Sequence, residues 1–245
     1  MSDILKVEEI GDIRRVTMNR PDRLNALNQT LTEELLHYFE ARRRDTGARV
    51  IIVTGAGRGF TAGADLKAMG QPDALKDGPH GDWYLRDLMK AMRGCPQPIV
   101  TLVKGPAAGG GLAIALASDV VVAGESAVFH TAFIKIGLTG AELGAAWRMQ
   151  RTMGLSRARE AMLTGRPIDA QDALRTGLVS SVVADDKLEA HGLELAQAMC
   201  AAQPDALRLT KRTLDAALEI GSFDAAMELE ERAQMLMIAR RPRPA

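Results

Sequence analysis

The chain has 245 residues, 47% of them hydrophobic, which is enough to bury a sizeable core in one large α/β domain. Its 31 basic residues equal its 31 acidic ones, so no broad positive field is present to hold nucleic acid or an anionic membrane. The two cysteines, Cys95 and Cys200, are far apart and form no CxxC pair, which argues against a disulfide framework or a zinc site. No apolar run resembles a secretion signal or a membrane span, so we expect a soluble, cytoplasmic protein without nucleic-acid or membrane partners.

The first elements in the chain are a predicted hairpin and a helix. Residues 4–7 and 16–18 flank a turn at Gly11 and carry the apolar pattern of paired strands. Residues 28–44 have an apolar face at helical spacing, and Thr30 is the predicted N-cap of that helix.

Two buried strands follow, and each leads into a glycine-bearing turn. Residues 49–54 and 99–103 are continuous apolar runs of strand length. After the second run, a glycine cluster leads into an apolar helix over 112–117 and a strand over 120–123. Because strands and helices alternate in this way, the predicted fold is layered α/β.

The last part of the chain predicts helices and no strands. Amphipathic segments cover about 191–202, 204–220 and 224–240. Their apolar faces exceed what a thin helical layer hides, so we expect burial against another subunit. We therefore divide the chain into an α/β core over 1–186 and a helical oligomerisation region over 187–245.

The two glycine-bearing turns, over 54–65 and 105–113, are the clearest candidates for a ligand site. Glycine lets the backbone approach a ligand closely, and unpaired N–H groups at a helix N-terminus favour negative charge. The first turn does not fit a GxGxxG dinucleotide motif, because Phe60 stands where glycine is required, and no phosphate-binding GxxxxGK[ST] motif occurs. The alternative is that both are tight turns that pack a helix on a strand.

Four motifs, in order, resemble the crotonase superfamily, the enoyl-CoA hydratase/isomerase family, from about residue 19 to 183. The motifs are Asn19-Arg20-Pro21 with Asn25-Ala26-Leu27, the run GFTAGADL over 59–66, the run GPAAGGG over 105–111, and Ala117-Ser118-Asp119. A later LTG at 163–165 and GLV at 177–179 are also similar to the family pattern. The resemblance implies a crotonase-like spiral of β-β-α turns with a C-terminal helical trimerisation region, assembled as a homotrimer or homohexamer. Coenzyme A is then part of an acyl-CoA substrate, and no separate cofactor or metal is expected.

The resemblance also implies which residues form the site. The backbone N–H groups of Ala64 and Gly110 match the positions that bind the thioester oxygen. The other matches lie around the adenine, the phosphate and pantetheine, or the acyl group. Ala62, Ala64 and Leu66, with Asp65 in the same segment, match the adenine site. Arg23 and Leu24 match the phosphate and pantetheine site, and His130 and Phe133 match the acyl pocket.

The sequence departs from the family's hydratases at the catalytic acids. Hydration needs two carboxylates, and the matching positions here are Ala113 and Phe133. The remaining acid is Glu142, at a point where double-bond isomerases of the family place an Asp or Glu. The alternative for Glu142 is an acid that stabilises the N-terminus of a helix over 143–153. His130 is either a proton shuttle or a packed wall residue.

The leading prediction is therefore an acyl-CoA enzyme of fatty acid metabolism, a lyase or isomerase, in which Glu142 carries the proton of a double-bond isomerisation. The alternatives are a hydratase with a non-standard acid, a hydrolase or decarboxylase, and a non-catalytic acyl-CoA binder. A serine peptidase ranks last, because no serine with a histidine partner follows the glycine run. The chain stops at Ala245, earlier than family hydratases, so we expect coenzyme A to be less enclosed.

Overall fold

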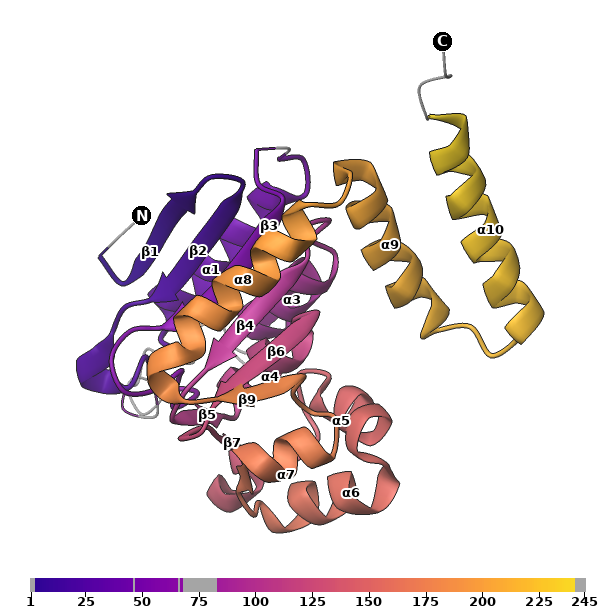
Figure 1. Ribbon diagram of the computed structural model, residues 1–245. Coiled ribbons are helices and arrows are strands. Elements are labelled where there is room, and N and C mark those ends of the chain that lie inside the picture. Colours follow the sequence, from indigo (N-terminus) through magenta and orange to yellow (C-terminus); the bar gives the residue numbers. More distant parts are fainter. Residues whose placement is uncertain (1–2, 46, 66, 68–82, 241–245) are drawn as a thin grey trace.

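The computed structural model describes residues 3–45, 47–65, 67 and 83–240, and it confirms the mixed α/β architecture (Figure 1). A six-stranded sheet forms the centre, with β1 and β2 antiparallel and the other neighbours parallel. In spatial order its strands are β1 (Leu5–Ile10), β2 (Ile13–Met18), β3 (Val50–Gly55), β4 (Ile99–Val103), β6 (Val120–Gly124) and β9 (Ser181–Val183).

A second, small sheet gives the fold its spiral form. It consists of β5 (Pro106–Ala108), β7 (Val128–His130) and β8 (Ile168–Asp169). The chain passes from β4 to β5 and then into α4 (Gly110–Ala117), and the next turn passes from β6 to β7 and into a 3-10 helix. Helices α5 (Ala145–Met153), α6 (Leu155–Thr164) and α7 (Ala170–Arg175) follow. Each turn therefore repeats the predicted β-β-α order.

The predicted opening hairpin is confirmed, and the first helix differs at its start. Gly11 has a φ of 58° at the turn between β1 and β2. The helix α1 (Gln29–Arg42) is capped by Asn28, whose Oδ1 accepts a hydrogen bond from Leu31 N at 3.1 Å. The prediction of Thr30 as the N-cap is wrong, because Thr30 already lies inside the first turn of α1.

The core has two parts, one on each face of the large sheet. Strand β3 alternates, with Ile51 and Val53 in the cluster that includes α1, α3 (Trp83–Arg93) and α4. Val50 and Ile52 belong to a cluster with α8 (Leu188–Cys200), which crosses the opposite face (Figure 1). Helix α8 lies so close that a Cβ added at Gly192 would be 2.5 Å from Leu102 Cδ2.

The three C-terminal helices are confirmed. Helix α8 packs on the sheet, whereas α9 (Pro204–Ala217) and α10 (Phe223–Ala239) form a pair that extends away from the core (Figure 1). Several large apolar side chains of this pair are exposed. They are Leu214, Leu218, Phe223, Met227, Met235, Leu236 and Ile238. Within the described part of the chain, none of the helices combines the length and the apolar character that a bilayer span requires.

Candidate active site

The first wall of the site is a loop that Asn25 holds in place. Asn25 is fully buried and has a φ of 52°. Its Nδ2 donates to the carbonyl oxygens of Ala56 and Gly59, both at 2.9 Å, and of Phe60 at 3.1 Å. In the other direction, Thr61 Oγ1 donates to the carbonyl oxygen of Asn25 at 2.7 Å. One side chain therefore supplies the donors for three carbonyl groups of the turn after β3.

The segment after this turn presents a free backbone donor. Leu27 N donates to Gly63 O at 2.8 Å, and Asp65 N donates to Leu27 O at 3.0 Å. Because these bonds use the residues on either side, the N–H of Ala64 faces away from Leu27. That N–H has no acceptor among the residues that the structure describes.

A second free donor comes from the start of α4. Gly109 is the N-cap with a φ of 51°, and its N–H donates to His130 O at 3.0 Å. The next N–H, that of Gly110, lies in the first turn of α4 and has no acceptor in the described part of the chain. The ring of Phe133 lies against Gly109, where an added Cβ would be 3.2 Å from Cε1.

These two donors and Glu142 line one cavity of about 90 Å³. Five residues of the predicted site face it, namely Ala62, Ala64, Gly110, Phe133 and Glu142. Among the described lining residues, Glu142 carries the only ionisable side chain. The geometry is that of two backbone donors and one carboxylate around a small, largely apolar space.

Glu142 lies in a loop and not in the first turn of a helix. The predicted helix over 143–153 begins later, at Ala145, with Gly144 as its N-cap at a φ of 79°. Leu143 has a φ of 52°, so the backbone between Glu142 and the cap is not helical. The first turn of α5 contains no acidic residue, which weakens the alternative that Glu142 serves the helix dipole.

The two positions that the family resemblance matches to hydratase acids are apolar. Ala113 is buried on α4, about one turn after Gly110, and Phe133 is 9% exposed in the wall of the cavity. Neither side chain exchanges protons, so Glu142 faces this space without a second carboxylate from the described residues.

The remaining predicted residues lie beside the cavity or outside the described part. Arg23 is exposed at the end of a 3-10 helix, and Leu24 O accepts a hydrogen bond from Ala62 N at 2.9 Å. Asp65 forms an ion pair with Arg20 at 3.0 Å, with both side chains largely buried. Leu66 falls outside the described residues.

His130 does not line this cavity. It lies on β7 and is half-buried, and burial followed by the nearby Lys135 lowers the pKa of its imidazole. A neutral imidazole outside the cavity agrees better with the wall-residue alternative than with a proton shuttle.

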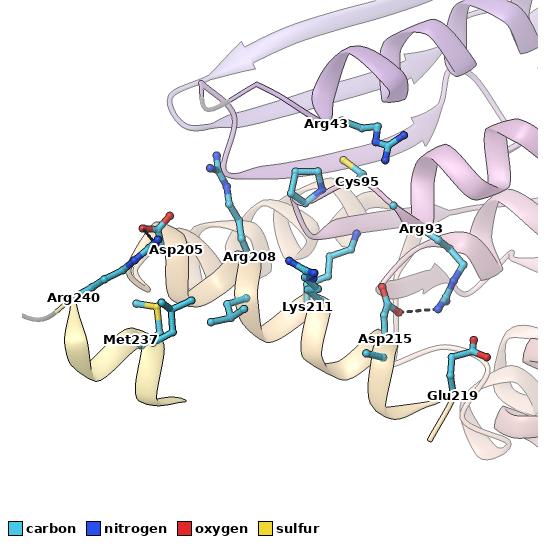
Figure 2. A pocket seen from close by; sticks show the side chains of 16 residues that line it. Arg43, Arg93, Cys95, Asp205, Arg208, Lys211, Asp215, Glu219, Met237 and Arg240 are labelled. Atoms are coloured by element: carbon cyan, nitrogen blue, oxygen red, sulfur yellow. Dashed lines mark hydrogen bonds and ion pairs between the residues drawn. The ribbon is translucent and has the colours of Figure 1, made fainter. Parts of the chain in front are cut away.

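A larger cavity, of about 790 Å³, lies between α9, α10 and the segment Arg93–Pro96, and none of the predicted site residues lines it (Figure 2). Its most buried basic group is Lys211, whose Nζ binds Asp119 Oδ2 at 2.7 Å and Gln97 O at 3.0 Å. This lysine anchors α9 to the core. In the part of the chain that the structure describes, no three His, Cys, Asp or Glu side chains are grouped to hold a metal ion.

Several walls of the small cavity come from side chains outside the set of site residues predicted from the sequence. Leu85 comes from α3, and Ile136, Leu138 and Leu143 come from the stretch on either side of Glu142. In the folded chain Ile136 is 48% and Leu138 is 45% exposed, which is unusual for large apolar side chains. The bonding role of Asn25 was also missed, although Asn25 belongs to the first motif.

Comparisons with known proteins agree with this fold. The family model described as enoyl-CoA hydratase/isomerase matches residues 8–241. A protein of Mycobacterium bovis named probable enoyl-CoA hydratase is 38% identical over 92% of this chain and 81% of its own length. The 1,2-epoxyphenylacetyl-CoA isomerase of Escherichia coli is 33% identical over 96% of this chain and 90% of its own.

Solved structures give the same result. The monofunctional enoyl-CoA isomerase of M. smegmatis superposes with a TM-score of 0.79 at 38% identity, over 92% of this chain and 99% of that one. An enoyl-CoA hydratase of Bacillus anthracis superposes with a TM-score of 0.91 at 30% identity, over 98% of this chain and 93% of that one. The β-β-α spiral is thus the fold of the crotonase superfamily of acyl-CoA enzymes. The chain belongs to the enoyl-CoA hydratase/isomerase family.

Proposed function

We propose that this chain is an enoyl-CoA isomerase that binds the thioester oxygen with the N–H groups of Ala64 and Gly110 and moves a proton with Glu142. The observation that carries the proposal is the shared cavity, which gathers two backbone donors without acceptors among the described residues and one carboxylate. Both donors come from backbone that is fixed by other hydrogen bonds, so they are oriented before a substrate binds.

The chemistry requires one base and one site for negative charge. When Glu142 removes a proton from the carbon next to the thioester of a 3-enoyl-CoA, the electron pair delocalises onto the thioester oxygen. The N–H groups of Ala64 and Gly110 stabilise that oxygen, and in other enzymes the loss of one such donor costs about 3–4 kcal/mol. The protonated Glu142 then returns the proton to the far end of the dienolate, and the double bond moves to the 2-position without any co-reactant.

Isomerisation fits the side chains better than hydration does. A hydration mechanism also has to activate water, and the side chains of Ala113 and Phe133 offer no base for that step. The isomerase names of the E. coli and M. smegmatis relatives support this choice, whereas the hydratase names of others keep a non-standard hydration as the alternative.

The proposal also covers the position of coenzyme A and the oligomeric state. Coenzyme A would lie along the segment that contains Ala62 and Asp65, near Arg23 and Leu24, and no further cofactor is required. The exposed apolar side chains of α9 and α10, such as Phe223 at 78%, support burial against further copies in a homotrimer or homohexamer.

The test is a product analysis with matched 2-enoyl-, 3-enoyl- and dienoyl-CoA esters in deuterated water, read by mass spectrometry. We expect double-bond migration as the main reaction. A main product of 3-hydroxyacyl-CoA would instead establish hydration, free coenzyme A would establish hydrolysis, and loss of carbon dioxide from a carboxylated ester would establish decarboxylation. Tight binding of all esters without any product would establish a non-catalytic acyl-CoA binder.

A further inference from the structure

The cavity at Glu142 is too small to hold a whole acyl group, and a second cavity lies beside it. The first has a volume of about 90 Å³, whereas the second has about 670 Å³, within the range of ligand pockets. Leu143 lines both. An acyl chain whose thioester lies at Gly110 can therefore extend past Leu143 toward the second cavity.

The same helices form the walls of both cavities. On α3, Leu85 lines the first cavity and Met89 the second, and on α4 the corresponding residues are Gly110 and Ala113. On each helix the step is about one turn, which advances about 5 Å along the axis. Ala113, which lines the second cavity, has a small side chain that takes up little of this space.

The second cavity, which we call the cationic chamber, is rich in positive charge. Its charged lining residues are four basic side chains, Arg86, Lys90, Arg93 and Arg148, and one acidic side chain, Glu219. The other lining residues are mostly apolar, which suits the methylene groups of a ligand. They are Met89, Ala113, Leu116, Ala117, Leu143, Gly144 and Trp147.

Two of the basic groups already have acidic partners. Arg93 forms an ion pair with Asp215 at 2.8 Å, seen as a dashed line in Figure 2, and Lys90 forms one with Asp87 at 3.2 Å. The guanidinium of Arg93 also lies 5.1 Å from the centre of the Trp147 ring.

Arg148 differs from these two. Its guanidinium makes no hydrogen bond or ion pair with any residue that the structure describes. Burial, followed by the nearby positive charge of Arg93, lowers the pKa of Arg148, and the negative charges of Asp119 and Asp215, which already pair with Lys211 and Arg93, only partly oppose this shift. A half-buried positive charge without a partner is unfavourable, and an anion bound in the chamber would offset that cost.

We propose that the cationic chamber binds a carboxylate at the far end of the acyl chain, so that the preferred substrate is the coenzyme A thioester of a dicarboxylic acid. Arg148 is the main ligand, because its planar guanidinium binds a carboxylate with two parallel hydrogen bonds. Arg93 adds a second positive charge, and Ala113 and Leu116 contact the methylene groups. The inference rests on the proposed function, since that function places the thioester at Ala64 and Gly110.

The test compares two 3-enoyl-CoA esters of equal chain length, one ending in a methyl group and the other in a carboxylate. Both kcat/KM and Kd are measured for the wild type, Arg148→Gln, Arg148→Lys and the control Arg157→Gln. Arg157 is exposed on α6, outside both cavities. The wild type should prefer the carboxylate ester by about tenfold or more. Arg148→Gln should lower this preference by about tenfold to a hundredfold, Arg148→Lys should lower it less, and Arg157→Gln should leave it unchanged.

Three results would overturn the inference. The first is a wild type that treats both esters alike or prefers the methyl ester. The second is an Arg148→Gln variant that weakens both esters equally while Arg148→Lys does the same, which indicates a structural role. The third is a preference that no Arg148 variant changes. If the wild type turns over neither ester, the proposed function fails, and the ratio of the two Kd values still decides whether the chamber binds a carboxylate.

Discussion

Asn25 Nδ2 lies 2.9 Å from the carbonyl oxygen of Gly59, and this bond joins two segments that are 34 residues apart in the sequence. The same amide also serves Ala56 and Phe60, so it fixes the turn that leads to Ala64. The orientation of the free N–H at Ala64 therefore depends on a side chain that does not line the cavity.

Replacing Asn25 by alanine tests this dependence. Buried carbonyl groups of the turn would lose their donor, so we expect Asn25→Ala to lower the free energy of unfolding by about 2–4 kcal/mol. Asn19→Ala is the matched control, because Asn19 Nδ2 donates one bond, to Asp3 O, in an exposed setting. It should change stability by less than about 1 kcal/mol in urea unfolding. Equal effects of the two substitutions would show that the turn does not need Asn25.

Adding a methyl group at Gly110 should block the candidate active site without unfolding the protein. A Cβ there would lie 2.9 Å from Leu27 Cδ1, a flexible side-chain end, and it would enter the small cavity. We expect Gly110→Ala to reduce kcat/KM by about a hundredfold or more, because the added methyl group keeps the thioester oxygen from reaching the backbone N–H, an effect comparable to losing that donor. The change in unfolding free energy should stay within about 1 kcal/mol. Gly221→Ala, at a position with no neighbour within 4 Å, is the control. Full activity of Gly110→Ala would remove Gly110 from the site.

Because α8 packs closely on the sheet, we expect alanine at Gly192 to lower the stability of the protein, the opposite of its usual effect in a helix. Alanine normally stabilises a helix by about 1 kcal/mol relative to glycine. Here its Cβ would lie 2.5 Å from Leu102 Cδ2, so overpacking should destabilise Gly192→Ala by about 1–3 kcal/mol. Thermal and urea unfolding measure the difference. A more stable Gly192→Ala would mean that α8 does not pack against β4 at this distance.

His130 should contribute to the acid sensitivity of the fold. Burial, with Lys135 nearby, lowers its pKa in the folded state, so the unfolded chain takes up a proton near pH 6.5 while the folded chain does not. Stability is therefore lost as the pH falls below about 6.5. Between about pH 7.5 and pH 5.5, His130→Gln should lose less unfolding free energy than the wild type. The control His37→Gln removes an exposed histidine, and a wild-type pH dependence in His130→Gln would contradict the assignment.

Much of the fold was predictable because its strands have simple patterns. The runs that form β3 and β4 are buried on both faces, and a continuous apolar run of that length is typical of a buried strand. The helix ends were less predictable. Asn28 and Thr30 are both residue types that cap helices, and only the packed register decides between them. The late start of α5 follows from the positive φ values of Leu143 and Gly144, and a positive φ at leucine is not expected from its side chain.

The site was predictable only in part, and for a different reason. The family resemblance supplied Ala64, Gly110 and Glu142, which the structure brings to one cavity. Composition and spacing would not have selected them. The cationic chamber gave no signal in the sequence, because its walls come from α3, α4, α5 and the segment after α9. Arg148 is one of many arginines until folding places it beside Arg93, with Asp119 and Asp215 near enough to act on its charge but already paired with Lys211 and Arg93.

The most direct test of the account is the single-turnover rate of double-bond migration from a 3-enoyl-CoA, measured for the wild type, Glu142→Gln and Glu125→Gln. Glutamine keeps the shape of the side chain and removes its basicity, and Glu125 is exposed on the loop between β6 and β7, outside the cavity. We expect Glu142→Gln to bind the ester with wild-type affinity but to migrate the double bond about 10²–10⁴-fold more slowly, and Glu125→Gln to match the wild type. Migration by Glu142→Gln at the wild-type rate would contradict the claim that Glu142 carries the proton.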